Sequence, residues 1–294
     1  FFFDYVYMKT PLNHCVDNFK KGFVDSLRFS IITPFFLQSH ELRGVFWQFL
    51  LLNGIFVLGS LYVGPYIRDG IANALMSLTN DPNASHSFIT AFAFLFKFAW
   101  MWPIRILAHL LNCVWSFRVF DEASKLQSFK QQTSFTQSYD RFLRYVTEYV
   151  YQLALLFFFW LEVNLCSLLP YVGFALSFLL CCWLHAFYVF DYRWAYEGKS
   201  LERRVKAFEL SWDYYFGFGT PMTLMYFALC RIPQHGPFVA FGVTSILFPI
   251  HIIVATCLRP HATPNGHRMP IFSHFAMKGV EMVLALRRIC RRLA

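Results

Sequence analysis

Three charged side chains lie inside long apolar stretches of this sequence, and their types could support chemistry there. They are Lys97, Arg105 and Glu162. A charge in hydrocarbon costs about 2.5–3.5 kcal/mol on insertion scales, so each needs a partner, water or the edge of a membrane. Three interpretations stay open: a buried pair of cation and carboxylate, a path for ions or protons, and side chains that extend to the interface.

Familiar catalytic patterns are missing from the sequence. No GxSxG, HExxH or P-loop pattern occurs. His185 and His251 stand in apolar stretches without a neighbouring ligand at metal-binding spacing, which favours core histidines. The eight cysteines show no CxxC spacing, which favours free thiols. We therefore expect no catalytic residue, no metal and no cofactor, and hence a protein that is not an enzyme.

Composition indicates the elements that must position these side chains. Hydrophobic residues make up 57% of the chain and charged residues 15%, against roughly 45–50% and 25% in soluble domains. The apolar residues come in blocks of about 20, enough for a helix to cross a hydrocarbon core of about 30 Å. This predicts a polytopic, all-α integral membrane protein. The net charge of +9 indicates anionic lipid headgroups as partners, and not nucleic acid, because the cations adjoin apolar blocks.

The apolar blocks are of two kinds. Two stand apart, Gly44 to Gly64 and Ser87 to Phe117, and predict long transmembrane helices. The other four form two pairs with almost no loop, one turning at Pro170 and one near Pro233. Each pair predicts a short helical hairpin that either spans the membrane or only enters it. The expected parts are an N-terminal interfacial segment over 1–43, a membrane domain over 44–257 and a basic tail over 258–294.

The placement of the cations predicts the orientation. With six crossings and both ends cytoplasmic, 22 of the 26 Lys and Arg residues lie on the cytoplasmic side. The opposite side carries a glycosylation sequon at Asn83, which agrees with a lumenal loop. No signal-peptide pattern opens the chain, and because it starts without Met, removal of an organelle-targeting segment stays open.

Both ends of the chain carry amphipathic helical patterns. Near the N-terminus Val16, Phe19, Phe23 and Leu27 recur at helical spacing, opposite a charged side. Two interpretations stay open: helices on an anionic membrane surface, or amphipathic helices packed on the protein itself. The cations of the tail that we expect to face lipid are Arg287, Arg288, Arg291 and Arg292.

The segment from Phe190 to Pro221, FDYRWAYEGKSLERRVKAFELSWDYYFGFGTP, resembles the etoposide-induced protein 2.4 family of endoplasmic-reticulum membrane proteins linked to autophagy. In that family an aromatic, an acid, Tyr, Arg and Trp close one hydrophobic block, and a Trp, two Tyr and a Phe-Gly-Phe-Gly-x-Pro run open the next. SLLP, SILFPI and GVFWQFLLL extend the resemblance over roughly residues 20 to 258. The signature residues here are Asp191, Tyr192, Arg193, Trp194, Tyr215, Gly217, Gly219 and Pro221.

The resemblance extends to bacterial sulfate permeases, which have two long transmembrane helices and two pairs of short helices. In those permeases a Gly-Leu-Arg at the start of the first long helix is associated with the anion. Here the place reads Glu41, Leu42, Arg43, so backbone room is lost and a carboxylate repels an anion. The arginine-rich stretch that relatives carry before the first span is also reduced to Ile31 to Arg43.

Three functions follow as expectations. The first is a non-enzymatic membrane protein of the endoplasmic reticulum, acting in autophagy or membrane organisation. The second is a structural accessory subunit of a larger complex, with the mitochondrial inner membrane as the alternative location. The third is a transporter or channel for a small anion such as sulfate. Expected partners are membrane lipids and other membrane proteins or further copies of the chain.

Overall fold

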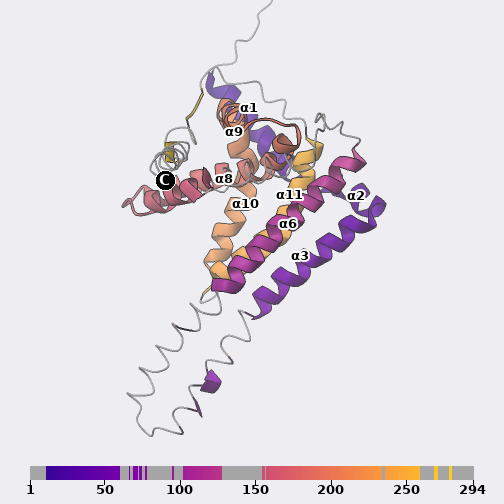
Figure 1. The fold of residues 1–294 in the computed structure, drawn as a ribbon. Coiled ribbons are helices and arrows are strands. Elements are labelled where there is room, and N and C mark those ends of the chain that lie inside the picture. Colours follow the sequence, from indigo (N-terminus) through magenta and orange to yellow (C-terminus); the bar gives the residue numbers. More distant parts are fainter. Residues whose placement is uncertain are drawn as a thin grey trace, which may run out of the picture. The chain divides into compact units, whose positions relative to one another are not determined.

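The computed structural model describes residues 11–59, 66, 69–71, 73, 74, 77, 95, 102–127, 154, 155, 157–233, 236–258, 268–270, 278 and 279. All regular elements among these residues are helices (Figure 1), so the predicted all-α fold is confirmed. The chain folds into two compact units. One comprises residues 32–127 and 225–253, and the other comprises residues 1–31, 128–224 and 254–294. The predicted divisions at residues 43 and 257 stay a prediction.

The first unit is built on two long helices, α3 (His40–Leu58) and α6 (Trp102–Leu126), which run side by side (Figure 1). The short α2 (Ile32–Gln38) precedes α3. Ser39 caps α3, because its Oγ accepts a hydrogen bond from the Leu42 N–H at 3.1 Å. The predicted first span therefore starts inside a helix that begins four residues before Gly44.

The two long helices meet through polar as well as aromatic contacts. The side-chain amides of Asn53 and Asn112 each donate to the other's Oδ1 at 3.1 Å. The rings of Phe49 and Trp115 pack edge to face at 5.6 Å between centroids. Asn53 is fully buried and Asn112 nearly so, and a reciprocal pair satisfies both amides without water.

The opposite side of each long helix is apolar and exposed. The exposed apolar residues recur every four positions on α3, and at intervals of three and then four positions on α6, so each set lies on one side of its helix. Such stripes suit contact with lipid, because exposed apolar patches of this size are rare on soluble monomers. They are Trp47, Leu51 and Ile55 on α3, and Leu107, Leu110 and Val114 on α6.

The second unit contains the hairpin that the sequence places at Pro170. The apolar helix Phe157–Ser167 is followed by a turn and then by α8 (Gly173–Tyr196). Tyr171 takes a left-handed backbone conformation in this turn, with φ 64°. A Cβ at Gly173 would lie 2.8 Å from the Cys166 carbonyl oxygen, and Ser177 Oγ donates to the Val163 carbonyl at 3.3 Å. The predicted tight hairpin is thus confirmed.

Two further helices follow α8, namely α9 (Leu201–Leu210) and α10 (Trp212–Cys230), and α11 (Gly236–Cys257) comes after a short turn. In that turn the Gly236 N–H donates to the Ile232 carbonyl at 3.0 Å, and a Cβ on Gly236 would collide with the Cys230 carbonyl. The two apolar blocks that the sequence pairs near Pro233 are therefore joined by a short turn, as predicted.

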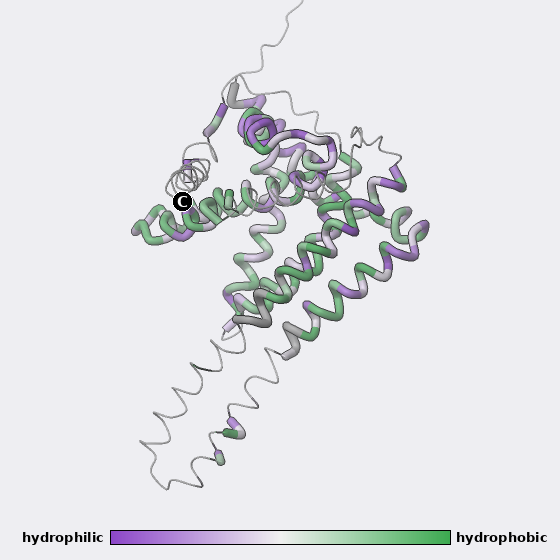
Figure 2. Tube along the Cα trace, viewed as in Figure 1, coloured by the Kyte–Doolittle hydropathy of each residue, from purple (hydrophilic) through white to green (hydrophobic). Residues whose placement is uncertain are grey.

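Among the described helices, α8 and α11 are long and apolar enough to cross a membrane by length and composition. Their 24 and 22 residues correspond to about 36 and 33 Å. Figure 2 shows α8 mostly in green. One helix of each hairpin is thus long enough to cross the hydrocarbon. Whether the hairpins span the membrane or only enter it stays open, as in the sequence-based prediction.

The charges over residues 191–211 predict a polar loop between two apolar blocks, but most of this segment is helical. Helix α8 continues to Tyr196 and α9 occupies Leu201–Leu210, with only Gly198 in a left-handed turn between them. The helix extends because Asp191 and Trp194 are buried. Polar residues in this segment therefore serve the interior of the unit as well as its surface.

Candidate functional site

Two signature residues, Trp194 of α8 and Tyr215 of α10, lie in an aromatic cluster of the second unit. Phe190 of α8, Phe208 of α9 and Phe218 of α10 complete this cluster. Phe208 and Tyr215 stack at 4.4 Å between ring centroids, and Phe190 meets Phe218 edge to face at 4.9 Å. Trp194 contacts Tyr215 at 5.7 Å. All five side chains are buried, and each such pair adds about 0.5–1.5 kcal/mol beyond burial of area.

A buried ion pair lies beside the aromatic cluster. Arg204 of α9 donates from its NH1 to Asp191 Oδ1 of α8 at 3.2 Å, with 2% and 1% of the two side chains exposed. Arg204 also donates from Nε to the Lys199 carbonyl at 2.7 Å. Buried charges need such partners. The pair therefore fixes α9 against α8.

Arg193 connects α8 to the end of α11. Its guanidinium donates to the carbonyl oxygens of Ala255 and Leu258, where a helix terminus leaves acceptors unpaired. Its Nε donates to Glu197 at 2.9 Å. Burial raises the pKa of Glu197, but the hydrogen bonds from Lys199 and Arg193 outweigh burial and hold this pKa below its usual range. The arginine of the signature is thus a positioning residue.

The signature glycines allow backbones to touch. A Cβ on Gly219 would lie well inside 3.0 Å of the Cys182 carbonyl oxygen of α8. Gly217 faces the Phe19 carbonyl of α1 (Pro11–Ser26) with the same lack of room. From the other side Gly22 of α1 faces the Tyr214 carbonyl. Close helix approach, and not cradling of a phosphate, accounts for these glycines.

Buried polar contacts add to the glycines between α1 and α10. Asn18 Nδ2 donates to Asp213 Oδ2 at 2.9 Å, and the Tyr214 hydroxyl donates to Asp25 Oδ2 at 3.0 Å. Arg28 pairs with Asp25 at 3.2 Å. The amphipathic pattern of the sequence places Asp25 on the charged side of this helix, but it gives no signal for Asn18 or Asp213.

The remaining signature residues have packing roles too. Tyr192 is 3% exposed, and its ring meets Tyr188 at 5.8 Å. Pro221 lies inside α10, where it removes one helical N–H. Directly before it, the Thr220 hydroxyl donates to the Phe216 carbonyl at 2.7 Å. The pocket at α2 is lined by other side chains and not by those of the signature.

The intramembrane charges are only partly described. Lys97 lies outside the described residues, as do the side chain of Arg105 and the tail cations Arg287, Arg288, Arg291 and Arg292. Glu162 stands in the helix Phe157–Ser167 and is half-buried. Its Oε2 is enclosed and receives no hydrogen bond within the described part of the chain. The predicted pairing of these charges stays a prediction, as does glycosylation at Asn83.

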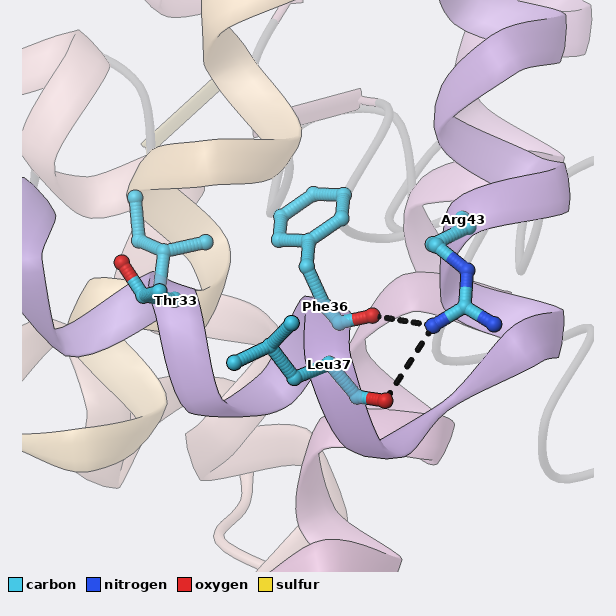
Figure 3. A pocket seen from close by; sticks show the side chains of 5 residues that line it. Thr33, Phe36, Leu37 and Arg43 are labelled. Atoms are coloured by element: carbon cyan, nitrogen blue, oxygen red, sulfur yellow. Dashed lines mark hydrogen bonds between the residues drawn. The ribbon is translucent and has the colours of Figure 1, made fainter.

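A pocket of about 580 Å³ lies between α2 and the start of α3, lined by Ile32, Thr33, Phe36, Leu37 and Arg43 (Figure 3). Figure 3 shows the Arg43 guanidinium turned toward the end of α2, where NH1 donates to the Phe36 and Leu37 carbonyls. Helix carbonyls at a C-terminus attract a cation. Arg43 therefore caps α2.

Comparison with known proteins gives this arrangement a context. The family model described as Sulfate transporter CysZ/Etoposide-induced protein 2.4 matches residues 29–250. The chain belongs to this family. It is 28% identical to the Protein EI24 homolog of Arabidopsis thaliana, over 80% of this chain and 81% of that protein. No solved structure matches it.

Two further relatives extend the comparison. The Protein EI24 homolog of Dictyostelium discoideum is 27% identical over 85% of this chain and 78% of its own length. The Uncharacterized protein L211 of Acanthamoeba polyphaga mimivirus is 25% identical over 73% and 74%. Family membership together with the apolar helices α8 and α11 establishes an EI24-like membrane protein.

The position that corresponds to the Gly-Leu-Arg of the permeases is used for structure in this family member. Glu41 accepts a hydrogen bond from Arg118 of α6 at 3.1 Å. This bond holds the pKa of Glu41 below its usual range, so the carboxylate stays charged next to Arg43. Together, Glu41 and Arg43 attach α3 to its neighbours on both sides.

Proposed function

We propose that this protein is a non-enzymatic membrane protein of the endoplasmic reticulum that acts in membrane organisation linked to autophagy. One observation carries the proposal: the residues on which the family resemblance rests are buried in packing. Asp191, Trp194 and Tyr215 hold α8, α9 and α10 together, and Gly217 receives α1. A family signature made of helix contacts suits a protein that acts through its folded shape in the membrane and not through a chemical reaction.

The chemistry of the described residues supports a role without catalysis. Acids of the signature region are engaged by cations or amides, as Asp191 is by Arg204 and Asp213 by Asn18. A general acid or base needs a free position toward a substrate. The buried ion pair and the aromatic cluster leave no such position around them.

Anion transport is the alternative that the family description raises, and the contacts of Arg43 speak against it here. Two of its hydrogen bonds go to the end of α2, and the carboxylate of Glu41 lies two residues away in sequence. An anion at this place would meet a cation already engaged and a neighbouring negative charge. We therefore propose that sulfate transport is not the function of this chain.

Depletion of the protein in its own cells tests the proposal. We expect stalled autophagic structures and reduced autophagic flux, restored by re-expression, with the tagged protein in the endoplasmic reticulum. Expression in Dictyostelium cells that lack their EI24 homolog adds a second, independent rescue. Unchanged flux after complete depletion would contradict the autophagy role.

Two measurements separate the alternatives. Proteoliposomes that take up sulfate or chloride above empty controls would favour transport. Copurification from native membranes in mild detergent addresses the accessory subunit. A stable, stoichiometric assembly in mitochondrial membranes would favour that function and exclude the proposed location.

A further inference from the structure

Helix α1 packs on α10 through a face that is polar and small. Asn18, Gly22 and Asp25 are spaced by four and three residues, so they share one side of the helix. Asn18 is 7% and Asp25 is 5% exposed. The apolar stripe expected from the sequence is not what this helix buries, because hydrogen bonds and glycine contacts with α10 take that place.

The apolar residues of α1 are left on its outer face. Val16, Val24 and Leu27 are 41%, 53% and 45% exposed, and they recur at helical spacing with Lys20 between them. Phe19, which the sequence groups with them, instead contacts Phe216 of α10 at 5.2 Å between ring centroids. The exposed side is thus rotated away from the docked side and keeps an apolar strip that Lys20 interrupts.

Cations lie within this strip and beside it. Lys20, Lys21 and Arg28 are exposed, and the exposed acid on this side is Asp17. Asp25 is buried, where it accepts a hydrogen bond from Tyr214 and pairs with Arg28. About half of the Arg28 side chain nevertheless remains exposed. An apolar strip with basic margins matches the interface of an anionic bilayer, where apolar side chains enter and cations meet headgroups.

We propose that this outer face of α1, formed by Val16, Lys20, Lys21, Val24, Leu27 and Arg28, binds the anionic surface of a membrane. The occupant is lipid, because the margin is basic while the strip is made of short, separated aliphatic side chains that suit acyl chains. The inference goes beyond the proposed function, since it concerns the lipid at α1 and does not depend on the organelle or on autophagy.

The test uses the full chain in vesicles of phosphatidylcholine and phosphatidylserine that contain a photoactivatable phosphatidylserine. After illumination, peptides are mapped with a protease that does not cut at lysine. We expect lipid adducts on residues 16–30, at a yield about fivefold lower in K20Q/K21Q. The matched control is R203Q/K206Q, which removes two exposed charges from α9 and leaves the yield on α1 unchanged.

Folding of the variants is checked separately, since Lys20 and Lys21 lie outside the contacts with α10 and their replacement should leave thermal unfolding in detergent unchanged. In the wild-type chain, added salt should lower the yield of adducts. The yield should also be lower when the photoactivatable lipid is phosphatidylcholine in place of phosphatidylserine. Equal yields from both lipids, or no adduct on α1, would overturn the proposal. So would an amine cross-link that joins Lys20 or Lys21 of two chains, because a second copy would then cover this face.

Discussion

Asp191 and Arg204 form an ion pair at 3.2 Å in which both side chains are almost fully buried. The two residues are 13 positions apart, on α8 and α9, and the turn between these helices brings them together. Because the Arg204 Nε also reaches the Lys199 carbonyl, one side chain ties the turn and both helices. The buried ion pair of the signature segment therefore holds α8, α9 and the turn between them together.

Removing one partner of this pair should destabilise the protein strongly. Arg204→Met leaves the Asp191 carboxylate buried without its cation, at a cost of about 3–5 kcal/mol, whereas the double change D191L/R204M should recover much of this. Thermal unfolding in detergent measures both. The exposed neighbour Arg203→Met is the matched control. A single variant as stable as the wild type would show that the pair is solvated in the protein.

The contact between α1 and α10 should not tolerate side chains at its glycines. Gly217→Ala places a methyl group on the Phe19 carbonyl, so the helices must separate, at about 1–3 kcal/mol. We expect faster proteolysis of the N-terminal segment. Gly44→Ala on α3 is the control, because nothing lies within 4 Å of its Cβ. That change should be neutral or slightly stabilising.

The amide pair between α3 and α6 should behave as one unit. Asn53→Leu leaves the Asn112 amide unsatisfied and should cost about 1–3 kcal/mol. The double change N53L/N112L removes both polar groups and should cost less than the sum of the single changes. A double-mutant cycle on unfolding temperature measures the coupling. Strict additivity would contradict the reciprocal bonds.

Acidification should weaken the link around Glu197. Its folded-state pKa is depressed, so its stabilisation is present above the unfolded value of about 4.3 and is lost as pH falls through the lower folded value. Glu197→Gln should therefore lower the unfolding temperature at neutral pH, and this difference should disappear once the pH falls below the lowered folded-state pKa. The exposed Glu202→Gln on α9 is the control. A constant difference between E197Q and wild type across pH would contradict this cause.

The apolar blocks allowed prediction of the helices and the tight turn at Pro170, because a proline between two apolar stretches permits few alternatives. The face that α1 buries was not predictable in the same way. Its periodicity favours Val16, Phe19, Phe23 and Leu27, yet its partner is a set of groups about 195 residues later. A hydrophobic pattern in α1 carries no information about a partner helix whose contact surface consists of polar side chains and glycine.

The segment after Phe190 shows a second limit of the sequence. Its charges indicate a solvated loop, but Arg204 is buried because Asp191 lies opposite it. Periodicity over ten residues could have suggested α9, whereas the pairing depends on the turn at Gly198. Family resemblance identified the right residues, and only the coordinates show that they serve packing.

The reciprocal fit of Gly22 and Gly217 has a consequence for how the chain is made. Asn18 and its acceptor Asp213 are 195 residues apart, so at ordinary rates of translation about 10–40 s pass before the partner of α1 exists. During that time the carboxylate of Asp25 and the amide of Asn18 remain hydrated outside the bilayer. Helix α1 thus completes its contacts only after α10 has been synthesised, and until then its polar face lacks the partners that it has in the fold.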